Sequence, residues 1–122
     1  MQLATLMVLT PDLDEARRFY EGVLGFAVAS QSKDLLVLDH AGAAFQVFRC
    51  EAPAPPSRHG RDATTVAVFA VARIDEAMSE LRAKGVDFLH AEPAANCFGR
   101  YAAFKAPGGN IHEIFERNAE SG

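Results

Sequence analysis

Basic residues are scarce in this sequence: 12 Lys and Arg stand against 16 Asp and Glu in 122 residues, for a formal net charge of −4. A nucleic-acid-binding protein of this size normally carries a basic patch, so we expect no nucleic-acid partner. No apolar run approaches the ~20 residues that a membrane-spanning helix needs. The first residues also lack the basic segment of a signal peptide. The sequence therefore predicts a cytoplasmic protein with no membrane partner.

Cysteine is equally scarce. Cys50 and Cys97 are too few for a disulfide scaffold, and their separation is not that of a metal site. We expect both to be ordinary reduced thiols. Hydrophobic residues make up 49% of the chain and charged residues 23%, which is the balance of a folded globular protein. The length predicts one domain spanning residues 1–122.

The chain begins with an apolar run, Leu3 to Leu9, which is followed by a helical pattern. Apolar residues recur at helical spacing as far as Leu24, and Gly25 is a natural stop. We expect Thr10 to cap this helix and Pro11 to occupy its first position.

The second half repeats this order, with an apolar run at Thr65 to Val71 and a helix that ends at Gly85. Short strands are predicted after each helix, at residues 26–30, 35–39, 43–50, 88–91, 100–105 and 111–116. The chain thus reads as βαβββ given twice. The predicted parts are module one at about 3–50, a proline-rich connector at about 51–63, and module two at about 64–117.

Two short motifs within this pattern resemble those of a known protein family. Phe19 and Tyr20 close the first helix, and the turn Pro107-Gly108-Gly109-Asn110 precedes the last strand. In this order and at this separation, the sequence resembles the vicinal-oxygen-chelate superfamily, which includes glyoxalase I, extradiol dioxygenases and bleomycin-resistance proteins. The resemblance implies an α+β fold in which two βαβββ modules form a cupped mixed sheet around a cleft. It also implies a homodimer.

In metal-dependent members of that superfamily, four ligands come from the first and last strands of each module. Carried over by position, these ligands fall at Thr5, Gln46, Val66 and Glu113. Only Glu113 is of the usual type, since transition metals in such sites need imidazole nitrogen and carboxylate oxygen. The resemblance therefore implies a fold that has lost its metal, and we expect no metal and no cofactor.

Strand alternation predicts that Glu113 and Phe115 share one face, while His112 faces the other way, under a helix or at a surface. Glu113 is either a rim carboxylate in water or a ligand-facing carboxylate inside the cleft. In the second case it needs a hydrogen-bond donor, which Gln46 could supply. Aromatic side chains suggest an apolar ligand site. The candidate ligand-binding residues come from the resemblance and from strand alternation. They are Thr5, Gln46, Phe48, Val66, Arg100, Tyr101, Glu113 and Phe115.

The charge of the ligand stays open at this stage. Glu113 favours a positive group, whereas Arg58, Arg61 and Arg100 favour an anion. His59 and His90 lie in predicted loops without zinc-type spacing, and we expect them to be solvated.

The leading hypothesis is a small-molecule-binding protein that needs no metal and holds an apolar or partly charged ligand between its modules. The alternative is a glyoxalase- or lyase-like enzyme, with an atypical metal site or with Glu113 as general acid or base. A third reading, an interaction module without a ligand, predicts a cleft filled by its own side chains. The sequence leaves open whether any reaction is catalysed.

Overall fold

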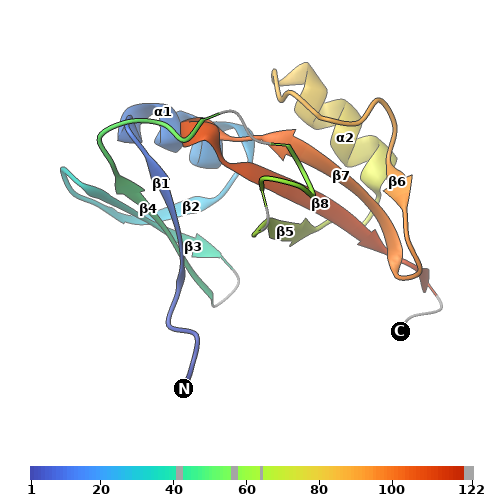
Figure 1. The fold of residues 1–122 in the computed structure, drawn as a ribbon, viewed down its shortest axis with the longest axis horizontal. Helices are drawn as coiled ribbons and strands as arrows, with labels where there is room; N and C mark the ends of the chain where they lie inside the picture. The colour runs from blue at the N-terminus through green and yellow to red at the C-terminus, as the bar shows by residue number, and fades with distance from the viewer. Residues whose placement is uncertain (41–42, 56–57, 64, 120–122) are drawn as a thin grey trace. The chain divides into compact units, whose positions relative to one another are not determined.

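The computed structural model describes residues 1–40, 43–55, 58–63 and 65–119, apart from the side chains of residues 40, 43 and 44. The chain divides into two compact units (Figure 1). The first comprises residues 1–55 and 107–110, and the second comprises residues 56–106 and 111–122.

The first unit is a four-stranded mixed sheet with one short helix. Its elements are β1 (Leu6–Thr10), α1 (Leu13–Arg17), β2 (Ala27–Gln31), β3 (Leu35–His40) and β4 (Ala43–Arg49). The strand order is β1-β4-β3-β2, with β1 parallel to β4 and the other pairs antiparallel. One turn of π-helix, Arg18–Val23, continues α1.

The start of α1 differs from the prediction. The helix is capped by Asp12, whose carboxylate accepts hydrogen bonds from the backbone N–H groups of Asp14 and Glu15. Thr10 instead ends β1 and is buried there. The prediction for Thr10 was wrong because a carboxylate one residue beyond Pro11 is better placed to accept from the first turn.

The second unit repeats the same topology. Its elements are β5 (Ala67–Ala70), α2 (Ile74–Ala83), β6 (Ala94–Ala95), β7 (Gly99–Lys105) and β8 (Ile111–Arg117). The strand order is β5-β8-β7-β6, with β5 parallel to β8. Figure 1 shows α2 alongside this sheet. The α+β class and the two βαβββ modules are thus confirmed.

One predicted strand is wrong. Residues 88–91 form only an isolated bridge, between Phe88 and Phe104, and the short edge strand β6 lies at Ala94–Ala95 instead. The backbone N–H of Leu89 still donates to the carbonyl of Ala103 at 2.8 Å. The segment therefore follows β7 without forming a regular ladder.

Each unit has its own core. In the first, the fully buried ring of Tyr20 packs against Phe19, Phe26 and Phe45, with ring centroids 5.3–6.3 Å apart. Burial raises the pKa of Tyr20 far above its usual range. In the second, Ile74 and Met78 are the buried residues of α2.

Glycine shapes the turns at equivalent places in the two modules. Gly25 and Gly85 follow the two helices and have φ values of 81° and 93°, in the left-handed region that glycine tolerates. Gly108 also has positive φ, and a Cβ there would lie 2.3 Å from the carbonyl oxygen of Leu9. The amide of Asn110 donates to that same carbonyl at 2.9 Å, so the turn before β8 closes against the end of β1.

None of the helices in the described ranges is both long enough and apolar enough to cross a bilayer.

Candidate functional site

The pairing of β5, β7 and β8 defines a sheet face that α2 leaves open. Glu113 lies opposite Val68 on β5 and Ala103 on β7, and Phe115 lies opposite Tyr101. Side chains of directly paired residues share one face of a sheet, so these five lie together. Val68 is 52% exposed. Ala103 is fully buried, so this face is accessible at β5 and covered along β7, and Glu113 is the acidic residue among the five.

Glu113 is held by a histidine from the chain segment before β5. The carboxylate oxygen Oε2 of Glu113 lies 2.9 Å from Nε2 of His59, and the two side chains are 15% and 22% exposed. The predicted donor Gln46 lies in the other unit, and the partner found for Glu113 is His59. The expectation that His59 is solvated was wrong, because the turn at residues 58–63 brings its imidazole against the sheet.

Two further rings surround this pair. The ring centroid of His90 lies 5.8 Å from that of His59 and 5.7 Å from that of Tyr101, and the Tyr101 ring lies 6.2 Å from His59. Nε2 of His90 is buried and has no hydrogen-bond partner among the described residues. His59, His90, Tyr101 and Glu113 thus form a cluster, which we call the imidazole–carboxylate cluster.

The opposite face of the same sheet is closed. His112 is 1% exposed and packs against Phe69 and Phe104, with ring centroids 5.5 Å and 5.9 Å away. Burial lowers the pKa of His112 to about 4, so the ring is neutral at pH 7. The alternation predicted for Glu113 and His112 is confirmed, and of the two predicted locations His112 takes the buried one.

Arg100 also belongs to this closed side, since it alternates with Tyr101 along β7. Its guanidinium makes two hydrogen bonds of 2.9 Å to the carboxylate of Asp75 on α2. Hydrogen bonding to Arg100 lowers the pKa of Asp75. The structure therefore places Arg100 on the face opposite Tyr101 and Glu113.

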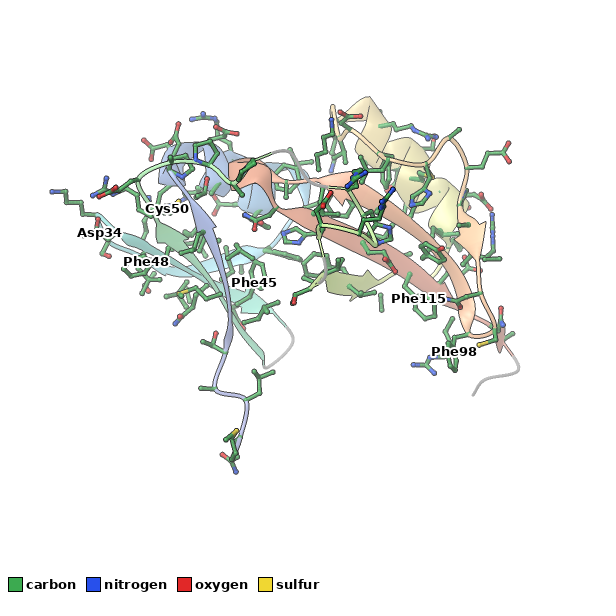
Figure 2. All side chains as sticks on the ribbon, in the orientation of Figure 1. Asp34, Phe45, Phe48, Cys50, Phe98 and Phe115 are labelled. Carbon is green, nitrogen blue, oxygen red and sulfur yellow. The ribbon has the colours of Figure 1, made fainter. Side chains whose placement is uncertain are left out.

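The sheet of the first unit carries a second apolar face. Gln46 pairs with Met7, and Phe48 pairs with Leu9 and Leu35. Met7, Leu9 and Phe48 are 50%, 46% and 41% exposed. Figure 2 shows Phe48 on this sheet and Phe115 on that of the second unit. Thr5 lies just before β1, where its hydroxyl donates to the carbonyl of Leu6.

The first unit also has a shallow hollow of about 340 Å³ beside the end of β1. The thiol of Cys50 lies there and donates to the carbonyl of Ala52, 3.2 Å away. Both cysteines are free thiols. The lining has no charged side chain, so the hollow offers shape without the chemistry found around Glu113. Its residues are Met7, Val8, Leu9, Cys50, Ala52, Ala54, Gly108 and Asn110.

The residues present do not fit a transition metal. Val66, half-buried just before β5, offers no donor atom, and Thr5 and Gln46 are neutral. Within the described part of the chain, no three His, Cys, Asp or Glu side chains are grouped so that they could share an ion. His59 adds one nitrogen next to Glu113, which makes two strong ligands where a stable site needs three or four.

The cluster can nevertheless recognise a ligand and move a proton. The carboxylate of Glu113 can accept from a ligand N–H or O–H, and the rings of Tyr101 and His90 can contact a flat apolar group. Histidine and carboxylate side chains are also the commonest general acids and bases.

Sequence reasoning missed His59 and His90. His59 lies 54 positions before Glu113, and no local spacing links the two residues. The described turn at residues 58–63 brings the His59 imidazole to Glu113.

The family model Glyoxalase/Bleomycin resistance protein/Dioxygenase superfamily matches residues 2–114. No curated protein matches the sequence.

Among solved structures, the chain is similar to a glyoxalase/bleomycin resistance protein/dioxygenase from Nocardioides, at 24% identity and a TM-score of 0.75 over 98% of this chain and 85% of the other. It is also similar to a protein of the same description from Alicyclobacillus acidocaldarius, at 18% identity and a TM-score of 0.77 over 98% and 94%. A third is the E126Q mutant of the fosfomycin resistance protein FosX from Listeria monocytogenes, complexed with Mn(II) and 1S,2S-dihydroxypropylphosphonic acid. That structure is 16% identical, with a TM-score of 0.77 over 98% and 92%. At these identities the likeness shows the fold alone.

Proposed function

Because the chain belongs to the glyoxalase/bleomycin resistance protein/dioxygenase superfamily, we propose that it is a small-molecule-binding protein that works without a bound metal. Its ligand lies on the open face of the second sheet, over Glu113, Tyr101 and Phe115. Sequestering a molecule needs only affinity and shape, so the loss of metal ligands does not impair this function.

The observation that carries the proposal is the carboxylate of Glu113 among the apolar residues that pair with it on β5 and β7. Glu113 is only 15% exposed, and its neighbours in register are Val68 and Ala103. Small-molecule sites are typically apolar surfaces with a few placed polar groups that fix orientation. A mainly apolar ligand with one hydrogen-bond donor or positive group matches this surface.

The arginines that favoured an anion are in part engaged elsewhere. Arg58 pairs with Asp62 at 2.7 Å within its own turn, and Arg100 pairs with Asp75. Glu113, whose partner is the imidazole of His59, is the acidic group at the face. The balance of charge therefore supports a neutral or positively charged ligand.

FosX is described as a resistance protein and forms a complex with Mn(II). The carried-over positions of the present chain hold neutral or apolar residues at three of four places, which supports binding without that metal. We infer no fosfomycin-directed activity from the likeness.

A second candidate function is catalysis of a proton transfer. The 2.9 Å contact between His59 and Glu113 favours it, because an imidazole can hold a catalytic carboxylate in place or exchange a proton with it. A ligand whose C–H or O–H bond lies over Glu113 is the substrate that this role requires.

We further propose that the protein is cytoplasmic, as the sequence predicts, and that it is a homodimer, as the family resemblance implies. Light scattering coupled to gel filtration measures the mass directly: twice the 13.2 kDa of the chain supports the dimer, and a single chain mass contradicts it.

Ligand binding is tested by screening apolar amines, anilines and carboxylates against the protein with two-dimensional amide NMR. We expect amines to shift signals of β7 and β8, and expect Glu113→Gln to weaken their binding at least tenfold. Glu51→Gln, which removes an exposed carboxylate from the connector, serves as the matched control. Preferential binding of carboxylates, or equal affinity in the Glu113→Gln variant, contradicts the proposal.

A further inference from the structure

The turn that carries His59 is held by its own hydrogen bonds. The carbonyl of Arg58 accepts from the backbone N–H groups of Arg61, Asp62 and Ala63 at 3.0–3.1 Å. The guanidinium of Arg58 closes the same turn by pairing with Asp62. Arg58, Arg61 and Asp62 are exposed, whereas His59 is half-buried. The turn is thus closed by hydrogen bonds among its own residues and presents one imidazole to the sheet.

The place that this imidazole occupies has the features of a small binding site. One nitrogen meets the carboxylate of Glu113 at 2.9 Å. The rings of Tyr101 and His90 lie at 6.2 Å and 5.8 Å, at interplanar angles of 41° and 82°. A flat nitrogen-bearing ring is therefore already surrounded by one acceptor and two aromatic walls.

His90 supplies an independent observation. Its Nε2 is buried, and no described residue offers it a hydrogen-bond partner. Such a group costs free energy until a partner is found, so polar groups of this kind are rare in folded proteins. The neighbouring His59 contacts the His90 ring edge-on but leaves Nε2 without a hydrogen bond. A ligand with a second polar atom can provide one.

We propose that His59 is an internal ligand that occupies the binding site of the second module, and that the external ligand is a flat, nitrogen-containing cation or N–H donor that displaces it. This inference rests on the proposed function and names its ligand class. The external molecule donates an N–H to Glu113, places its ring against Tyr101 and brings a polar atom to Nε2 of His90. Aromatic amidines and imidazole-like heterocycles have this chemistry.

Competition between the two ligands gives the proposal a direct consequence. In the wild-type protein the His59–Glu113 contact must break before the external molecule binds. The apparent affinity for that molecule is therefore the intrinsic affinity multiplied by the fraction of protein in which the site is open. Removing the imidazole removes this competitor. Affinity for a flat, nitrogen-containing cation or N–H donor should then rise when His59 is replaced, whereas replacing a binding-site residue usually lowers affinity.

The experiment compares benzamidine binding by calorimetry to the wild type, His59→Ala and the double variant His59→Ala/Glu113→Gln. We expect His59→Ala to bind benzamidine at least tenfold more tightly than the wild type, and expect the double variant to lose this gain. Arg61→Ala, which alters an exposed residue of the same turn, is the matched control and should bind like the wild type. Benzoate, of the same shape but opposite charge, should not gain affinity.

A second measurement needs no variant. In the wild type, NMR contacts between the ring protons of His59 and Tyr101 should disappear when benzamidine is saturating. Persistence of these contacts, or a His59→Ala variant that binds benzamidine no better than the wild type, overturns the internal-ligand proposal. If an amine from the screen above still binds in a Glu113-dependent way, the proposed function survives that result. If amine binding does not depend on Glu113, both the proposed function and the internal-ligand proposal are contradicted.

Discussion

The carboxylate of Glu116 on β8 accepts a hydrogen bond from the backbone N–H of Ile74, 2.7 Å away, at the first residue of α2. Arg73, the residue before the helix, makes no side-chain capping bond. A strand side chain therefore caps the helix and ties it to the sheet face that it covers. Glu116 thus lies on the sheet face that α2 covers, and Glu113 lies on the other face.

Removing this cap should weaken the second unit. We expect Glu116→Ala to lower the free energy of unfolding by about 1–2 kcal/mol, since a helix cap and a buried N–H partner are lost together. Glu116→Gln keeps an acceptor oxygen and should lose less. Urea unfolding followed by circular dichroism measures both, with the exposed Glu51→Ala as control. Equal stability of Glu116→Ala and the control contradicts the capping role.

Acid should destabilise the protein through His112. Its pKa is about 4 in the folded protein against an ordinary value of 6.5, so the folded state disfavours the charged ring. The contribution of neutral His112 to the free energy of unfolding is therefore fully present above about pH 6.5. It falls by up to about 3 kcal/mol as the pH drops from there through 4.

The measurement for His112 is the free energy of unfolding between pH 7 and pH 4. We expect His112→Leu to show a shallower decline over this range than the wild type, whatever its absolute stability. An identical pH dependence in both proteins would show that other groups cause the acid sensitivity.

The turn before β8 should not tolerate a side chain at Gly108. A Cβ there would lie 2.3 Å from the carbonyl oxygen of Leu9 and 2.9 Å from Cα of Thr10, at a φ of 80°. We expect Gly108→Ala to cost about 2–4 kcal/mol. Gly22→Ala is the control, because nothing lies within 4 Å of its Cβ position, and it should be neutral or slightly stabilising. Comparable melting temperatures of the two variants count against this account of the turn.

Much of the fold could be predicted from the sequence because its signals are local. Helical spacing, the glycines after each helix and the alternation along β8 depend on neighbours within a few residues. The predictions for Thr10 and for a strand at residues 88–91 were wrong because nearby residues take those roles. Asp12 caps α1, and the edge strand forms at Ala94–Ala95.

The candidate site was less predictable because it depends on distant contacts. Glu113 could be identified from the alternation along its strand and by resemblance. Its partner His59 is 54 positions away, and the pairing of Arg100 with Asp75 spans 25 positions. Neither pair leaves a periodic signal in the sequence. The charge that the site favours could therefore be argued only once these partners were known.

The central claim is that the protein binds its ligand without a metal, and metal titration tests it most directly. Zn²⁺, Ni²⁺, Fe²⁺ and Mn²⁺ are each titrated by calorimetry into protein freed of metal with a chelator, and into the Glu113→Gln variant treated in the same way. The account predicts weak binding, with dissociation constants above about 10 μM and little difference between the two proteins, because too few strong donors surround Glu113. Submicromolar binding that disappears in Glu113→Gln would contradict it and favour a metal-dependent enzyme.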